Sequence, residues 1–175
     1  MADKSSFTPE EWSRLVASPI VASMAITAAD PGGLFSLLQE SMSSGWALLE
    51  AKQDAQATPL VKAVADDISN AQTRNAVKDS FQSQFKGSQF ADVKRKAIEE
   101  LSAVSALLDT KAPGDAAAFK SWLWSVAQKS AEAGKEGGFL GFGGVAVSDA
   151  EKATLAEIAT ALGNPAGAGA GLAET

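Results

Sequence analysis

The chain has 175 residues, of which 46% are apolar and 21% are charged, a balance typical of folded globular domains. It contains no cysteine, histidine or tyrosine, which excludes disulfides, thiolate metal sites and the usual general bases and transition-metal ligands. Its 15 lysines and arginines against 21 aspartates and glutamates give a net charge of −6, which disfavours binding to nucleic acid.

A chain of this length buries one sizeable core, so we expect a single helical domain over residues 1–163. Residues 164–175 are mainly glycine and alanine, and we expect a flexible tail there. Residues 1–6 lack the apolar core and cleavage site of a secretory signal, which favours a cytoplasmic location. Residues 15–29 fall short of the roughly 20 apolar residues that cross a bilayer, so no transmembrane segment is expected.

The first predicted helix begins at Thr8-Pro9, where Thr8 can cap, Pro9 fits the first turn and Glu11 can complete a capping box. An apolar stripe at intervals of three and four follows; it comprises Trp12, Leu15, Val16, Ile20 and Met24. Pro19 lies inside this stripe. Because an interior proline removes a backbone hydrogen bond and costs on the order of 3 kcal/mol, we expect a kink or a break at this point.

The next predicted helix starts at Asp30-Pro31 and runs to about residue 53. Thr58-Pro59 repeats the signal of a cap followed by proline, ahead of a short apolar face; this face comprises Leu60, Val61, Val64, Ile68 and Ala71. A further start at Thr73 leads to Val77, Phe81 and Phe85, with Gly87 as a stop. The alternative is that these last two segments form one bent helix.

The clearest periodicity follows a Ser88 cap; it comprises Phe90, Val93, Ala97, Leu101, Val104 and Leu108. Residues 112–114 end this helix, and Asp115 is the predicted cap of the next. The predicted buried side of that next helix comprises Phe119, Trp122, Leu123, Val126 and Ser130. A capping box from Ser148 to Glu151 starts the last helix, which points Leu155, Ile158 and Leu162 inward and stops at Gly163.

Strand-like alternation of valine, isoleucine and threonine is confined to residues 145–147. Six or seven helices joined by short proline-marked or glycine-marked turns predict an all-α fold, a single-domain antiparallel helical bundle. A glycine-rich apolar loop near the C-terminus completes the expected architecture.

That loop, residues 136–144, is the segment that local propensity explains least. It holds five glycines together with Phe139, Leu140 and Phe142, and each glycine weakens a helix by roughly 1 kcal/mol relative to alanine. One interpretation is a tight turn whose aromatic side chains plug the end of the bundle. The other is an exposed apolar tip that contacts a partner, a second copy or a membrane surface. A phosphate-binding loop is disfavoured, because a helix precedes the segment and no lysine stands where the Walker motif requires one.

The four tryptophans form a second unusual group. Trp122 and Trp124 lie two residues apart on a predicted helix, so their side chains point roughly 200° apart and one of them is expected outside the main core. Core packing is the default for Trp12, Trp46 and Trp122. Trp124 is therefore the candidate for a binding surface.

Charged clusters indicate solvated helix faces rather than sites. The basic run at residues 94–96 is followed by Glu99 and Glu100 at a spacing that favours intrahelical ion pairs, so no nucleic-acid partner is expected. Adjacent carboxylates such as Asp66 and Asp67 point about 100° apart on a helix and are poorly placed to share a metal ion. We expect no metal and no cofactor.

These observations favour a non-enzymatic helical interaction or structural protein that binds a protein partner or forms a homo-oligomer. The candidate contact residues are Trp124, Phe139, Leu140 and Phe142. Two alternatives stay open: a carrier of a small hydrophobic ligand with a pocket between helices, and a helical protein of a membrane or granule surface. Enzymatic activity through carboxylates and lysines is less favoured, since only three arginines are available to clamp an anion.

Overall fold

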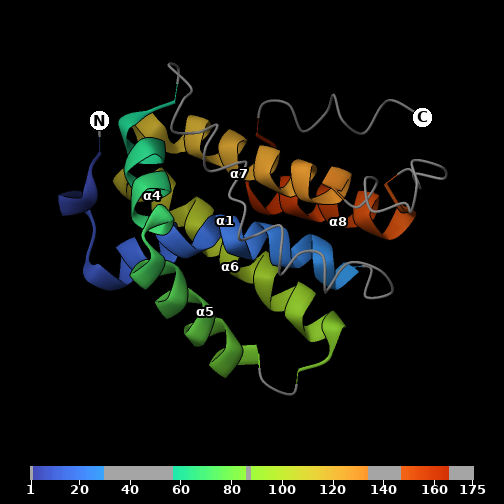
Figure 1. The fold of residues 1–175 in the computed structure, drawn as a ribbon. Helices are drawn as coiled ribbons and strands as arrows, with labels where there is room; N and C mark the ends of the chain where they lie inside the picture. The colour runs from blue at the N-terminus through green and yellow to red at the C-terminus, as the bar shows by residue number, and fades with distance from the viewer. Residues whose placement is uncertain (1, 30–56, 86–87, 134–146, 166–175) are drawn as a thin grey trace.

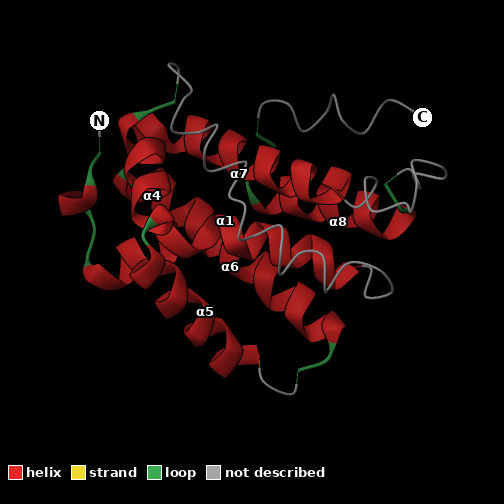
Figure 2. Ribbon diagram, viewed as in Figure 1, coloured by secondary structure: helices red, strands yellow, loops and turns green. Residues whose placement is uncertain are grey.

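The computed structural model describes residues 2–29, 57–85, 88–133 and 147–165, and these residues form helices without any strand (Figure 2). The all-α expectation is confirmed. In chain order the elements are the 3-10 helix η1 (Lys4–Ser6) and the α-helices α1 (Pro9–Ala29), α4 (Pro59–Ser69), α5 (Ala71–Phe85), α6 (Phe90–Lys111), α7 (Pro113–Ala133) and α8 (Asp149–Ala161).

Among the described helices, α1, α6, α7 and α8 form a bundle in which each packs against the other three. Figure 1 shows that α6 runs antiparallel to α1, α7 antiparallel to α6, and α8 antiparallel to α7. Helix α4 crosses the end of the bundle where α1 begins, and it contacts α1 and α7. Helix α5 continues from α4, which is its main neighbour among the described helices.

Helix α1 is the central element of the bundle, because it packs most extensively on α6 and also contacts α4, α7 and α8. Small and polar residues of this helix, including Ser18, Ser23 and Thr27, are buried together with its apolar ones. The apolar residues of α1 that are at most 2% exposed are Leu15, Val16, Val21, Ala22, Ala25 and Ile26. Neighbours on several sides therefore leave α1 little contact with solvent.

The expected break at Pro19 does not occur, because α1 continues through this residue as one helix. Proline has no N–H to donate to the carbonyl of Leu15, four residues earlier. The hydroxyl of Ser18 donates a hydrogen bond of 2.7 Å to that carbonyl instead. A neighbouring side chain thus satisfies the acceptor that proline leaves open.

Helices α4 and α5 are two separate helices rather than one bent helix. Thr58 caps α4 as predicted, since its hydroxyl accepts a hydrogen bond from the backbone N–H of Val61. Asn70 has an extended backbone with ψ of 127° and ends α4, and its side-chain oxygen accepts from the N–H of Gln72. Helix α5 therefore starts at Ala71, two residues before the predicted start at Thr73.

Within α5 the described side chains are mostly exposed, and Val77 is buried as predicted. The side chains of Phe81 and Phe85 lie outside what the structure describes. Ala71, which the sequence placed on the apolar face of the preceding helix, is exposed. Of these two helices, α4 supplies most of the buried side chains that are described. They are Leu60, Val61, Val64, Ala65 and Ile68.

The predicted core stripe of α6 is confirmed from Ala97 onward, but the start of this helix differs from expectation. The N-cap is Gln89, not Ser88, and its side chain makes no capping hydrogen bond. Phe90, the first residue of α6, is 44% exposed. The buried stripe comprises Ala97, Leu101, Val104 and Leu108.

Asp115 does not cap α7, because this helix already begins at Pro113. The carboxylate of Asp115 is instead buried, with the residue 3% exposed, and it accepts a hydrogen bond of 2.8 Å from the backbone N–H of Ala2. The contact joins the N-terminal segment to the first turn of α7. A residue type that often caps helices is here used for a tertiary contact.

The end of α8 follows the prediction closely. Gly163 has a φ of +76°, a left-handed conformation that favours glycine. The N–H of Gly163 donates to the carbonyl of Thr160, and the N–H of Asn164 donates to that of Ala159. These two bonds define a Schellman motif, which satisfies carbonyls at the end of the helix.

Three predicted features lie outside the described residues: the helix from about residue 30 to 53 with Trp46, the glycine-rich segment 136–144, and residues 166–175 of the expected tail. Among the helices that the structure does describe, α1 alone is long and apolar enough to cross a membrane. In this fold, 67% of its apolar window is buried. A buried core helix passes the same test of length and composition, so a transmembrane segment is not clearly indicated.

Candidate functional site

Trp124 is buried, which contradicts its assignment as an exposed contact residue. It is 2% exposed and belongs to the hydrophobic core. Trp122 is the more exposed of the two and packs edge-on against Phe119, with ring centroids 5.2 Å apart. The expectation failed because α7 has neighbours on several sides, namely α1, α4, α6 and α8, so opposite faces of this helix are both covered.

The other three predicted contact residues, Phe139, Leu140 and Phe142, lie outside the described residues. The structure does describe the two points from which their segment departs. Because α7 and α8 are antiparallel neighbours, the end of α7 and the start of α8 lie at the same end of the bundle (Figure 1). The connection between them therefore begins and ends at that one end.

Each attachment point has a buried residue close to it. On the α7 side, Ala131 is 1% exposed. On the α8 side, Ser148 and Glu151 form the predicted capping box: the N–H of Glu151 donates to the Ser148 hydroxyl at 3.2 Å, and the N–H of Ser148 donates to the Glu151 carboxylate at 2.8 Å. The glycine-rich segment thus connects two fixed helix ends.

Three buried polar atoms on the same two helices have no hydrogen-bond partner: Nε1 of Trp122, Nε1 of Trp124 and Oε1 of Glu151. Glu151 is only 5% exposed, and its other carboxylate oxygen is the one engaged by Ser148. A buried polar atom without a partner costs about 1–3 kcal/mol, and each such atom calls for an explanation. A water molecule or a ligand that reached these atoms would relieve that cost.

The opposite end of the bundle holds a second polar cluster, where the N-terminal segment meets α4. The carboxylate of Asp67 accepts hydrogen bonds from the Lys4 ammonium and from the Trp12 indole N–H, both at 2.7 Å. The Lys4 ammonium also lies 5.5 Å from the centre of the Trp12 ring. The ammonium of Lys4 and the indole N–H of Trp12 hold the pKa of Asp67 below its usual value.

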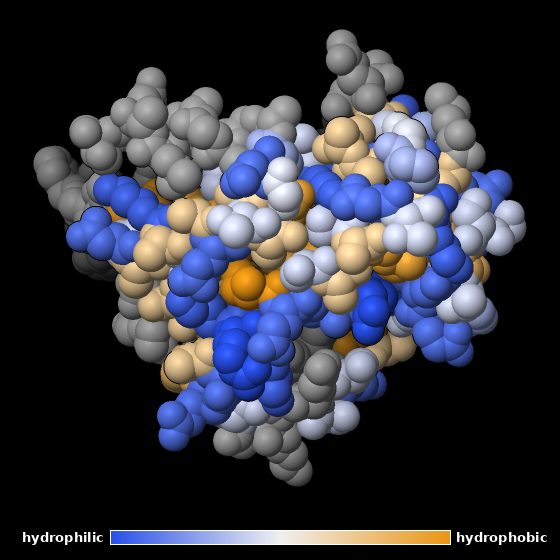
Figure 3. Space-filling view, turned by 180° about the vertical axis from the view of Figure 1, so that it is seen from behind, coloured by the Kyte–Doolittle hydropathy of each residue, from blue (hydrophilic) through white to orange (hydrophobic). Residues whose placement is uncertain are grey.

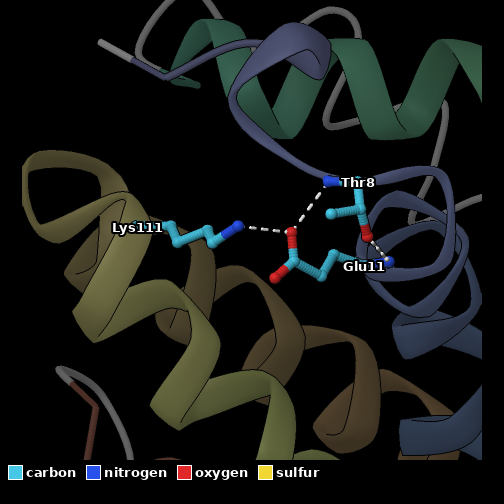
Figure 4. Close-up of polar contacts among 3 residues, drawn as sticks. All are labelled: Thr8, Glu11 and Lys111. Carbon is cyan, nitrogen blue, oxygen red and sulfur yellow. Dashed lines mark hydrogen bonds and ion pairs between the residues drawn. The ribbon is translucent and has the colours of Figure 1, made fainter.

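At the same end of the bundle, an ion pair between Glu11 and Lys111 joins α1 to α6 (Figure 4). Its carboxylate accepts from the Lys111 ammonium at 2.7 Å and from the backbone N–H of Thr8 at 2.8 Å. The Lys111 hydrogen bond and the Thr8 N–H lower the pKa of Glu11. The Thr8 hydroxyl accepts from the N–H of Glu11 in return, which confirms the predicted capping box.

A shallow depression of about 280 Å³ lies beside this cluster and is open to solvent. Its charged side chains already have partners, since Lys111 binds Glu11 and Asp115 accepts from Ala2. The lining residues are Ala2, Ser6, Lys111, Ala112, Pro113, Gly114 and Asp115. We interpret the charges here as structural ties between the N-terminal segment and the bundle.

The basic run at residues 94–96 contributes to ion pairs of two kinds. Arg95 binds Glu99 at 2.7 Å within α6, as its spacing predicted, whereas Lys94 reaches Glu157 of α8 at 2.8 Å. Arg14 of α1 binds Glu100 of α6 at 2.6 Å. The face seen in Figure 3 mixes hydrophilic with apolar areas, and the most hydrophobic atoms lie around its middle. The charges of this run therefore serve helix stability and helix packing.

In the described part of the chain, no group of three or more acidic side chains lies close enough together to hold a metal ion. Comparison with models of known protein families, with curated proteins and with solved structures gives no match.

Proposed function

We propose that this protein is a non-enzymatic helical scaffold that presents Phe139, Leu140 and Phe142 to a protein partner or to a second copy of itself. The observation that supports this proposal is the attachment of their segment to the end of α7 and the start of α8, two neighbouring helices whose residues Ala131 and Glu151 are buried, at one end of the bundle. A cytoplasmic location is part of this proposal, and fractionation of the source cells tests it.

Attachment to fixed ends matters for binding because it limits the entropy that a connecting segment loses when it is ordered by a partner. Glycine permits backbone angles that other residues avoid, so a tip with five glycines can adapt to a partner surface. Each phenylalanine buried in an interface removes roughly 150–250 Å² from water. At about 25 cal/mol per Å², two such side chains supply a substantial part of the affinity of a small interface.

The experiment is the double variant F139S/F142S, compared with the wild-type chain and with F90S as a matched control. Phe90 is a large apolar residue that is exposed in the described part of the chain, at the start of α6, so F90S measures the effect of losing an exposed phenylalanine other than the two that the proposal names. Light scattering over a range of concentrations measures self-association, and pull-down from source cells measures partner capture. The proposal predicts that the double variant loses association and that F90S keeps it.

Association that persists unchanged in F139S/F142S would contradict the proposal. Flotation of the wild-type chain with liposomes, lost in the double variant, would show that the segment meets a membrane surface rather than a protein. Both measurements require that the variants stay folded, which circular dichroism checks.

A second candidate function, carriage of a small ligand between helices, is motivated by the buried polar atoms of Trp122, Trp124 and Glu151 that have no hydrogen-bond partner. Because the two tryptophans face different sides of α7, one ligand would meet at most one indole N–H, so an apolar molecule with a single hydrogen-bond acceptor would suit such a site. Native mass spectrometry of protein purified from its source tests this idea directly. A measured mass equal to that of the chain alone, together with tryptophan fluorescence that organic extraction leaves unchanged, would end it.

A further inference from the structure

We draw no further inference here: the strongest candidate, the group of buried polar atoms without hydrogen-bond partners at Trp122, Trp124 and Glu151 of α7 and α8, carries nothing because the two tryptophans face different sides of α7 and no cavity formed by the described residues brings the three atoms together.

Discussion

The Ser18 hydroxyl donates a 2.7 Å hydrogen bond to the carbonyl of Leu15, the acceptor that Pro19 leaves without its helical donor. Both Ser18 and Leu15 are 0% exposed, so water does not replace this bond. We expect Ser18→Ala to lower the free energy of unfolding by about 1–3 kcal/mol, the cost of a buried polar group without a partner. Urea unfolding followed by tryptophan fluorescence measures the loss.

Replacement of Pro19 provides the control for this prediction. Pro19→Ala restores a backbone N–H at residue 19 that can donate to the Leu15 carbonyl. Ser18→Ala should therefore lower the free energy of unfolding less in the Pro19→Ala background than in the wild-type chain. The two sites should therefore be coupled in a double-mutant cycle. Strictly additive effects would mean that the Ser18 hydroxyl does not act through the Leu15 carbonyl.

Gly163 ends α8 in a left-handed conformation, and the backbone alone makes it hard to replace. A Cβ at this position would meet only the Lys120 ammonium, at 3.9 Å, so there is no steric clash. We expect Gly163→Ala to cost about 1–2 kcal/mol through its positive φ. Gly114→Ala is the matched control, because nothing lies within 4 Å of the added methyl group and residue 114 is helical. This control should leave the melting temperature unchanged or raise it slightly.

Lys120 and Asp109 form an unequal ion pair between α7 and α6. The lysine side chain is 11% exposed and the aspartate 61%, and the ammonium lies 2.6 and 2.7 Å from the two carboxylate oxygens. Asp109→Ala leaves a nearly buried charge without its partner, so we expect a loss of about 1.5–3 kcal/mol. Lys120→Met removes the charge and keeps most of the packing, so its effect should be close to zero. Chemical denaturation of both variants measures these losses. A larger loss of the free energy of unfolding in Lys120→Met than in Asp109→Ala would contradict this account.

Asp67 should make the free energy of unfolding depend on pH in the acid range. Its pKa is lowered from 3.8 in the folded chain, so the unfolded chain binds the proton more readily. The stabilisation is complete above pH 3.8, the ordinary pKa of the carboxyl group, and is lost as the pH falls through the lower pKa of the folded chain. Asp67→Asn should therefore reduce stability at neutral pH, by about 1 kcal/mol or less for so exposed a pair, and should make no difference in strong acid. Urea titrations at both pH values test this, with Asp79→Asn on an exposed part of α5 as a control for the lost charge.

Local signals predicted the helix ends that depend on a few neighbouring residues. Thr8 with Glu11, Thr58, Ser148 with Glu151, and Gly163 all act as their sequence context indicated. In each case the hydrogen bond or the backbone angle is set within about five residues, so no knowledge of the rest of the fold is needed.

Two helix starts, at Ser88 and Thr73, were also misplaced by one or two residues. The larger errors occurred where tertiary contacts decide the outcome. Asp115 has the chemistry of a cap but binds the backbone of Ala2, more than a hundred residues away in the chain. Trp124 was assigned to the surface on the assumption that one face of its helix meets solvent, whereas neighbouring helices cover both faces. Pro19 was expected to kink or break α1, and the break does not occur. The hydrogen bond from Ser18 to the Leu15 carbonyl depends on a side-chain rotamer that the residue pattern does not show. Of the four predicted contact residues, only Trp124 lies among the described residues, and there the prediction was wrong.

The most direct test of the proposed function is the free energy of unfolding of F139S/F142S, measured beside its association. If the two phenylalanines form an exposed contact, the monomeric fold should lose no more than about 0.5 kcal/mol, as is usual for surface substitutions, while association is lost. If they instead plug the end of the bundle, unfolding should become easier by several kcal/mol, in the range of about 3–5 kcal/mol for a deleted core phenylalanine. A large loss of stability with association unchanged would contradict the account.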